Sequence, residues 1–405
     1  MRERGLPAAE ILADLEARQG RDPSVHGARL FGLVYPTGRA DLEALVEEVD
    51  RRYLFGNALN PFKFVELAAL ERELVDAVAG LLHVPEGGGG TMTSGGTESI
   101  LMSMLVNRER ARARGVERPQ ILAPYSAHPA YAKAAHYFDM DVVRIPLDTA
   151  FRADVRAAEE LVGPSTAVVI ASAFNYPHGI MDPVEELAAL AAAHGVGCHV
   201  DACIGGFVLP FLERLGVDVP GWDFRVEGVT EISADVHKYG YCPKGASVIA
   251  HRDADWFERQ VFLFSDWPAG LYGSPAMAGA RPAAPIATAW AVVNHLGVDG
   301  YTELMRGLME TATKVREGIG GIDGLEIVGD PIGPVLSFRS ASVDLDAVAD
   351  VMDDRNWNVN RNTDPRGLHV MLSPAHATVA DEFLADLRYA VGHHGESRGV
   401  EARYS

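Results

Sequence analysis

The sequence has few cysteines, a deficit of basic residues and no long uninterrupted apolar run. Three cysteines occur in 405 residues, and their positions fit neither a metal-ligand spacing nor a disulfide framework (Cys198, Cys203 and Cys242). We therefore expect reduced thiols and no bound metal. With 36 Lys and Arg against 56 Asp and Glu, the formal net charge is -20. Such an acidic chain repels nucleic acid and anionic membrane surfaces, so neither is an expected partner.

The distribution of apolar residues also predicts neither a targeting segment nor a membrane-spanning segment. The most apolar region, residues 187–212, is interrupted by His194, His199 and Asp201. It therefore lacks the roughly 18 uncharged apolar residues that a membrane-spanning helix needs. Residues 1–5 do not read as the start of a signal peptide. These features predict a cytoplasmic protein without a membrane anchor.

Short apolar strands alternate with helical segments through the middle of the chain. Residues 166–172 form a continuous apolar, largely β-branched run, which is typical of a strand buried on both faces. Other strands are predicted at residues 120–124, 141–147, 197–201, 229–234 and 246–251. This rhythm predicts an α/β fold with a large, mostly parallel sheet covered by helices. Active sites of such sheets lie at the carboxyl ends of the strands.

The pattern changes near both ends, which divides the chain into three parts. Residues 1–55 are predicted to be a helical arm, and residues 56–295 the large domain. Residues 296–405 are predicted to form a smaller α+β domain, with strands at 325–328, 334–339 and 368–372 and helices at 345–355 and 380–391.

Two charged residues follow predicted strands of the large domain. Lys238 lies in the loop after strand 229–234, where a deprotonated amine could form an imine with a carbonyl cofactor. A lysine in a loop, taken alone, is more often a solvent-exposed side chain with no specific function. Asp201 ends a strand too apolar for a lone carboxylate, so it needs a cation such as a protonated pyridine nitrogen. It could instead cap the next segment. His199, on the same strand, either supports Asp201 or is a satisfied core histidine.

Two further segments suggest cofactor contacts. The run TSGGTES at residues 93–99 leads into an apolar helix, and its glycines, hydroxyls and helix-terminal amides could bind a phosphate. The same hydroxyls could simply cap the helix. His128, in a loop after strand 120–124, could stack on a planar ring or be ordinary polar surface.

Taken in chain order, these four features resemble those of fold-type I enzymes that use pyridoxal 5'-phosphate (PLP). The similarity extends to one family within this fold type, because five blocks of sequence resemble the sphingosine-1-phosphate lyases, relatives of the group II PLP-dependent decarboxylases. The blocks are TSGGTESILMS, SAHPAYAKAAHYF, HVDACIGGFVLPF, FRVEGVTEISADVHKYGYCPKG and GLYGSPAMAGARP. The resemblance covers roughly residues 40 to 395.

The resemblance implies a role for each of several residues. Lys238 would be the Schiff-base lysine, Asp201 the partner of the pyridinium nitrogen and His128 the ring-stacking residue. The remaining cofactor contacts would be the phosphate loop, a histidine beside the phosphate and an amide near the ring hydroxyl (Ser94, Gly95, Gly96, Thr97, His237 and Asn175). The family works as a homodimer with shared active sites, and the partner chain would supply Tyr272, Gly273 and Ser274.

Substrate contacts are implied less directly. Lys244 matches the family lysine that meets the substrate phosphate, and Tyr35 nearly aligns with a family tyrosine in that role. A family histidine is replaced here by Asn60, so a group that could carry charge becomes a neutral amide. Arg281 could compensate. The implied reaction is cleavage of a carbon–carbon bond in a phosphorylated sphingoid base, which gives a long-chain aldehyde and phosphoethanolamine.

Two other functions fit parts of the sequence. An amino-acid decarboxylase could use the same scaffold, because PLP breaks whichever bond is held perpendicular to its ring. A protein that has lost catalysis and serves as a binding subunit is the second alternative. Retention of Lys238, Asp201, His128 and the phosphate loop argues against the second.

Overall fold

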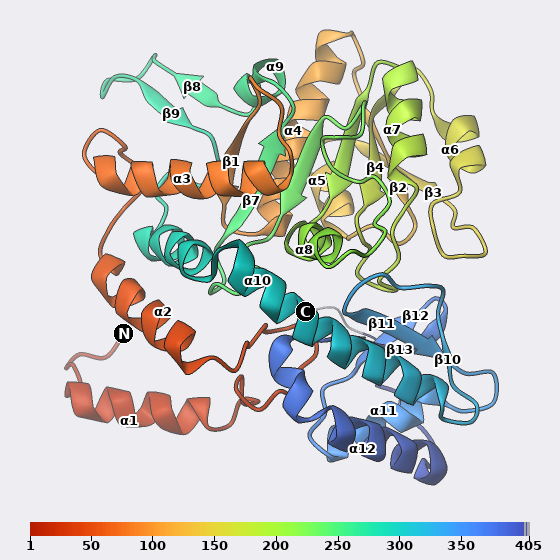
Figure 1. Ribbon diagram of the computed structural model, residues 1–405. Coiled ribbons are helices and arrows are strands. Elements are labelled where there is room, and N and C mark those ends of the chain that lie inside the picture. The colour runs from red at the N-terminus through yellow and green to blue at the C-terminus, as the bar shows by residue number, and fades with distance from the viewer. Residues whose placement is uncertain (401, 403–405) are drawn as a thin grey trace.

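A computed structural model describes residues 1–400 and 402, which form two lobes connected by helix α10 (Ala283–Gly320) (Figure 1). The large lobe is built on a seven-stranded sheet in the order β1-β7-β6-β5-β4-β2-β3. Its strands are β1 (Gly89–Thr93), β2 (Gln120–Pro124), β3 (Asp141–Ile145), β4 (Thr166–Ser172), β5 (Gly197–Asp201), β6 (Glu231–Ala234) and β7 (Ser247–His251). Strand β7 runs opposite to the other six strands, so its two pairings are antiparallel and all other pairings in this sheet are parallel. The predicted α/β fold with a mostly parallel sheet is confirmed.

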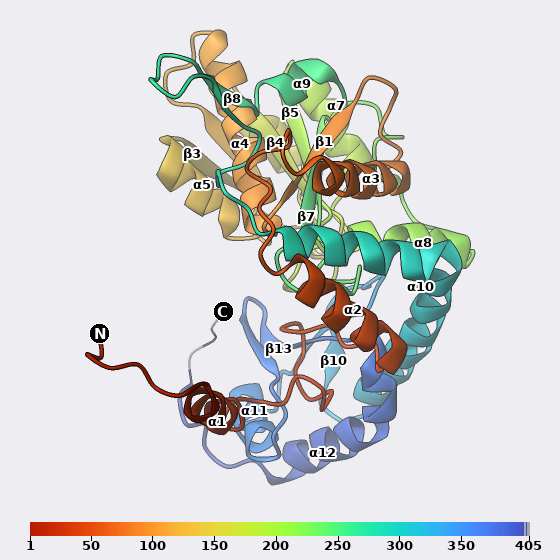
Figure 2. The same cartoon turned by 90° about the vertical axis from the view of Figure 1, so that its left-hand side faces the viewer.

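The central strands are buried on both faces, as the continuous apolar pattern predicts. All seven residues of β4 and all five of β5 are buried. Helices α4 (Gly96–Ala113) and α5 (Ala130–Phe138) pack together on one face, and α6 (Val155–Leu161) and α7 (Val184–Ala193) lie on the other (Figures 1 and 2). Shorter elements complete the lobe: η1 (Gly205–Phe207), α8 (Leu209–Arg214), α9 (Ala254–Glu258), β8 (Phe262–Phe264) and β9 (Tyr272–Ser274).

The small lobe is an antiparallel sheet of four strands in the order β10-β11-β13-β12. Its strands are β10 (Glu326–Ile327), β11 (Val335–Arg339), β12 (Asn360–Thr363) and β13 (Arg366–Met371), accompanied by α11 (Leu345–Asp354), η2 (Pro374–Thr378) and α12 (Ala380–His393). Strand β12 is not among the predicted strands. Its sequence, NRNT, has no apolar alternation because none of its side chains enters the core.

The N-terminal residues are helical, with α1 (Ala8–Gln19), α2 (Ala40–Tyr53) and, beyond the predicted arm, α3 (Val65–Leu81). Helix α1 buries none of its residues, whereas α2 packs along α10. Between α1 and α2, Phe31 is buried against Trp357 and Phe383 of the small lobe. Helix α10 breaks at Gly297, whose φ of 55° suits glycine. The domain boundaries at residues 55 and 295 remain predictions.

None of the helices in the described part of the chain combines the length and apolarity needed to cross a membrane.

Candidate active site

A cavity of about 570 Å³ lies where the first residues after β1, β5 and β6 meet. This is the carboxyl edge of the parallel strands, as expected for an open α/β sheet. Eleven of the residues predicted to bind cofactor or substrate line this cavity: Tyr35, Ser94, Gly95, Gly96, Thr97, His128, Asn175, Asp201, His237, Lys238 and Lys244.

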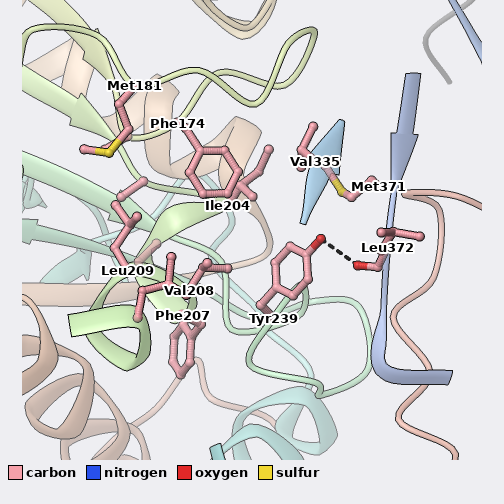
Figure 3. Packing of buried hydrophobic residues seen from close by; sticks show 14 of the residues in the cluster. Phe174, Met181, Ile204, Phe207, Val208, Leu209, Tyr239, Val335, Met371 and Leu372 are labelled. Carbon is pink, nitrogen blue, oxygen red and sulfur yellow. Dashed lines mark hydrogen bonds between the residues drawn. The ribbon is translucent and has the colours of Figure 1, made fainter. Parts of the chain in front are cut away.

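Lys238 is held at the cavity by a tightly fixed loop. Its neighbour Tyr239 donates a hydrogen bond of 2.8 Å to the carbonyl oxygen of Leu372 in the small lobe (Figure 3). Gly240 packs so closely that an added Cβ would lie 2.3 Å from the carbonyl oxygen of Val236. The lysine therefore projects from a loop that both lobes hold in place.

Asp235 is the carboxylate that faces Lys238. Its Oδ2 lies 3.0 Å from Lys238 Nζ and 3.6 Å from His237 Nε2, and its side chain is 2% exposed. Burial alone would raise the pKa of Asp235, but Lys238 and His237 lower it, and the net result is a lowered pKa. Burial also lowers the pKa of His237 to about 4. At neutral pH the site thus contains a carboxylate beside Lys238 and an uncharged imidazole.

Asp201 ends β5 and is buried at the cavity wall. Its Oδ1 accepts the backbone N–H of Cys203 at 3.1 Å, and among the described residues it has no ion-pair partner. A buried carboxylate needs a cationic or hydrogen-bonding partner, and a protonated pyridine nitrogen would supply one. His199 does not hydrogen-bond to Asp201 within the described chain. Its Nε2 lies 3.0 Å from Ser233 Oγ instead, as in a core histidine.

The loop between β1 and α4 forms a cradle that only glycine permits. A Cβ on Gly96 would lie 2.7 Å from Cys203 Sγ and 2.8 Å from both carboxylate oxygens of Asp235. A Cβ on Gly95 would lie 3.1 Å from His237 Cε1. Because neither glycine carries a side chain, a phosphate could approach the backbone amides at the N-terminus of α4 closely.

Glu98 modifies the predicted role of Ser94. The backbone N–H and the hydroxyl of Ser94 both donate to Glu98 Oε2, at 2.7 and 2.5 Å. The other carboxylate oxygen of Glu98 accepts the N–H of Met277 at 2.8 Å. The donors left for a phosphate are therefore those of Gly95, Gly96 and Thr97, while Ser94 is positioned by Glu98.

The two predicted ring contacts lie in the same cavity. His128 is largely buried, and burial lowers its pKa, so an uncharged imidazole is available for stacking. The Oδ1 atom of Asn175 accepts the backbone N–H of His178 at 3.0 Å. Its buried Nδ2 has no hydrogen-bond partner in the described residues, so it is a donor for a ring hydroxyl. The residues present therefore fit PLP.

Lys244 and Tyr35 lie together beside the cofactor residues. Lys244 Nζ is 4.6 Å from the centre of the Tyr35 ring and donates to the carbonyl oxygen of His237 at 3.3 Å. Burial, and then the positive charge of Lys238, lower the pKa of Lys244 to about 8. Below that pH its ammonium group can attract an anionic end of a substrate.

The remaining predicted site residues do not line this cavity. Arg281 was expected beside the substrate, but its guanidinium pairs with Glu71, with Nη2 3.0 Å from Oε2. Its guanidinium is therefore already paired within this chain, and its role beside the substrate stays a prediction. Asn60 accepts the backbone N–H groups of Phe62 and Lys63. Tyr272, Gly273 and Ser274 were expected from a partner chain. Of these, Gly273 and Ser274 line a second cavity, whose wall also includes Arg281.

Other residues of the cavity were not predicted from the sequence. Asp235 could have been found, because it is an acidic residue directly after the β6 strand and three positions before Lys238. Among the others, Tyr176, Asn358 and Asn360 have weak sequence signals, because they reach the cavity only through tertiary packing.

The lysine, the strand-end carboxylate and the glycine cradle define a PLP-dependent enzyme. The sequence profile described as "Pyridoxal-dependent decarboxylase conserved domain" matches residues 53–341. The chain is 40% identical over 391 residues to a sphingosine-1-phosphate lyase of Oryza sativa, covering 94% of this chain and 72% of that protein. It is 38% identical to sphingosine-1-phosphate lyase 1 of Mus musculus, covering 96% and 68%.

Solved structures agree with the sequence comparison. A sphingosine-1-phosphate lyase of Burkholderia pseudomallei matches with a TM-score of 0.93 and 38% identity, covering 97% of this chain and 92% of the other. A glutamate decarboxylase of Lactobacillus brevis, at 22% identity and a TM-score of 0.85, shares the fold. The chain belongs to the sphingosine-1-phosphate lyase family of the pyridoxal-dependent decarboxylases. It is a PLP-dependent lyase, and the amino-acid decarboxylase alternative is not favoured.

Proposed function

We propose that the protein cleaves a phosphorylated sphingoid base by a retro-aldol reaction, giving a long-chain aldehyde and phosphoethanolamine. One observation carries this proposal: a single cavity holds both a PLP-type lysine, Lys238, and a second lysine, Lys244, that can receive a phosphate. The names of the relatives support the same substrate class.

The cofactor, when bound, withdraws the electrons left on the amine-bearing carbon of the substrate as an adjoining bond breaks. Lys238 would hold the cofactor covalently, and its Nζ, 3.0 Å from Asp235, can carry a proton once it is released. Asp201 would keep a proton on the ring nitrogen, and His128 would cover one face of the ring. Asn175 would fix the ring hydroxyl through its free amide donor.

Lys244 would hold the substrate phosphate while its ammonium remains charged. It lies in the cavity wall beside Tyr35, and Tyr35 in turn contacts Met371 of the small lobe. The Tyr35 hydroxyl lies 3.0 Å from Met371 Sδ, and the tyrosine is part of the cavity wall where a ligand would lie.

We further propose a homodimer with shared active sites. Large apolar side chains are exposed on two segments beside the second cavity, including Phe55 (94% exposed), Phe62 (88%) and Leu271 (73%). Contiguous exposed apolar patches are typical of interaction surfaces. In a dimer across this face, Asn60, Arg281 and the segment 272–274 would be available to the partner's site. The three thiols are free and buried, which suits the proposed cytoplasmic location.

Products distinguish this reaction from decarboxylation. Purified holoenzyme is given sphinganine 1-phosphate or unphosphorylated sphinganine, and aldehyde, phosphoethanolamine and carbon dioxide are quantified. We expect aldehyde and phosphoethanolamine in equal amounts from the phosphorylated base alone. A matched Lys244→Gln variant should lose the preference for the phosphorylated base. Absence of aldehyde, with carbon dioxide from an amino acid instead, would show that the protein is a decarboxylase.

A further inference from the structure

Glu98, in the first turn of α4, is hydrogen-bonded to two segments that lie far apart in the chain. Its Oε2 atom accepts the N–H and the hydroxyl of Ser94, in the loop that forms the phosphate cradle, at 2.7 and 2.5 Å. Its Oε1 atom accepts the N–H of Met277, 179 positions further along the chain, at 2.8 Å. Glu98 lines the catalytic cavity and is 8% exposed, so water competes little for these bonds. One carboxylate therefore holds the cradle and the segment around Met277 together.

That segment, residues 272–279, forms a compact turn that begins with β9. Strands β8 and β9 form a small sheet of their own, which stands apart from the seven-stranded sheet (Figure 1). Inside the turn, the Ser274 hydroxyl lies 2.9 Å from the carbonyl oxygen of Ala276. Gly279 packs against Tyr272, since an added Cβ would lie 2.8 Å from the Tyr272 hydroxyl oxygen. Because these contacts tie its two ends together, we expect the turn to move as one unit.

A second attachment fixes the turn to the seven-stranded sheet. The buried Gln260 donates from Nε2 to the carbonyl oxygen of Pro275 at 2.5 Å. Its Oε1 atom lies 2.6 Å from Nε2 of His251, in β7. Of the two attachments, the one through Glu98 contacts the cradle, whereas the one through Gln260 contacts a strand.

We propose that Glu98 is a positioning residue that couples occupancy of the phosphate cradle to the turn at residues 272–279. A phosphate bound in the cradle would fix the loop that carries Ser94, and Ser94 would then fix Glu98 and, through it, Met277. In the proposed homodimer this turn borders the partner's site, so cofactor bound in one subunit would order part of the other subunit's substrate pocket. That consequence rests on the proposed function and its homodimer, whereas the coupling within one chain rests on the three hydrogen bonds to Glu98.

Replacement of Glu98 by glutamine tests the coupling with little change in volume. The amide has one oxygen and one NH2 group, so in either orientation an NH2 donor faces the donors of Ser94 or the N–H of Met277. Whichever way the amide turns, one of the two links is lost and the connection through the side chain is broken. Glu109→Gln is the matched control, because Glu109 lies on the same helix and pairs with Arg108 at 2.6 Å instead.

Hydrogen–deuterium exchange of peptides that cover residues 272–280 measures the coupling. Rates are compared by mass spectrometry in the apoenzyme and in the holoenzyme with saturating PLP. In the wild type, PLP should slow exchange in this turn by about fivefold or more, as is typical of coupled sites. In Glu98→Gln the ratio of the two rates should fall to about one, and affinity for PLP should fall about tenfold because the cradle loses a buried support. Glu109→Gln should match the wild type in both measurements.

Two more variants separate the coupling from simple damage to the turn. Gln260→Met removes the bond to Pro275, so it should speed exchange of the turn in both states, but PLP should still slow that exchange because Glu98 is intact. Glu98→Asp, whose side chain is one methylene too short to span both segments, should lose the effect of PLP even if Glu98→Gln fails to fold.

The exchange experiment uses PLP alone, so its outcome does not depend on the lipid substrate. Slowing that persists in Glu98→Gln would mean that a partner's cofactor protects the turn directly, and it would overturn the role of Glu98. If PLP leaves the turn unchanged in a wild-type protein that releases aldehyde, the coupling alone is overturned. If the coupling is present but no lipid is cleaved, the proposed function alone fails.

Discussion

Replacement of Gly96 by alanine should weaken the binding of PLP. The new Cβ would lie 2.7 Å from Cys203 Sγ and 2.8 Å from both oxygens of Asp235, and neither group can retreat easily because both are buried. Overpacking of this kind costs about 1–3 kcal/mol, equivalent to about five- to 150-fold in affinity for PLP. We expect that loss because relief of the contacts must move the cradle away from the phosphate.

Equilibrium titration of the apoenzyme with PLP, followed by absorbance, measures the effect. Gly307→Ala is the matched control: Gly307 lies on the exposed side of α10 with nothing within 4 Å of an added Cβ. Alanine is favoured over glycine in a helix by about 1 kcal/mol, so this variant should bind PLP normally and unfold no more easily. The double variant Gly96→Ala with Cys203→Ala should recover part of the affinity. Wild-type affinity in Gly96→Ala would refute the proposed cradle.

Three further predictions concern charged groups. Asp235→Asn removes the carboxylate that lies 3.0 Å from Lys238 Nζ, so the pKa of Lys238 should fall. Acylation of Lys238 in the apoenzyme at pH 7, followed by peptide mass spectrometry, should then be faster. An unchanged rate would contradict the pairing. Because the pKa of Lys244 is lowered to about 8, its charge is lost as the pH rises through that value. KM for a phosphorylated base should therefore increase above pH 8 in the wild type but not in Lys244→Gln. The buried carboxyl of Glu231 has a pKa raised by burial from 4.5 to about 8, so the folded protein keeps a proton that the unfolded chain releases. The free energy of unfolding should fall between pH 5 and pH 8 in the wild type and fall less in Glu231→Gln, as measured by urea denaturation; equal slopes would exclude this titration.

Much of the large lobe could be predicted because its local signals agree with its tertiary environment. Strands β4 and β5 are continuous apolar runs, and both are fully buried. Asp201 ends β5 and Lys238 lies in the loop after β6, the neighbouring parallel strand, so their convergence follows from the topology of a parallel sheet. The glycines at positions 95 and 96 signal a close backbone approach, which the structure shows.

Contacts between distant segments were harder to predict. Strand β12 is polar on both faces and has no periodic pattern. The roles of Glu98 and Asp235 depend on partners that only the folded chain brings near, Met277 for Glu98 and the Gly96 cradle for Asp235. Arg281 was assigned to the substrate by alignment, but its pairing with Glu71 is a property of the packed structure.

Reductive trapping of the cofactor tests the central claim most directly. Holoenzyme is treated with borohydride, digested, and searched for a peptide that carries the reduced PLP adduct. The adduct should lie on Lys238, and Lys238→Ala should trap none and release no aldehyde. An adduct on Lys244, or full aldehyde release by Lys238→Ala, would contradict the assignment of the catalytic lysine.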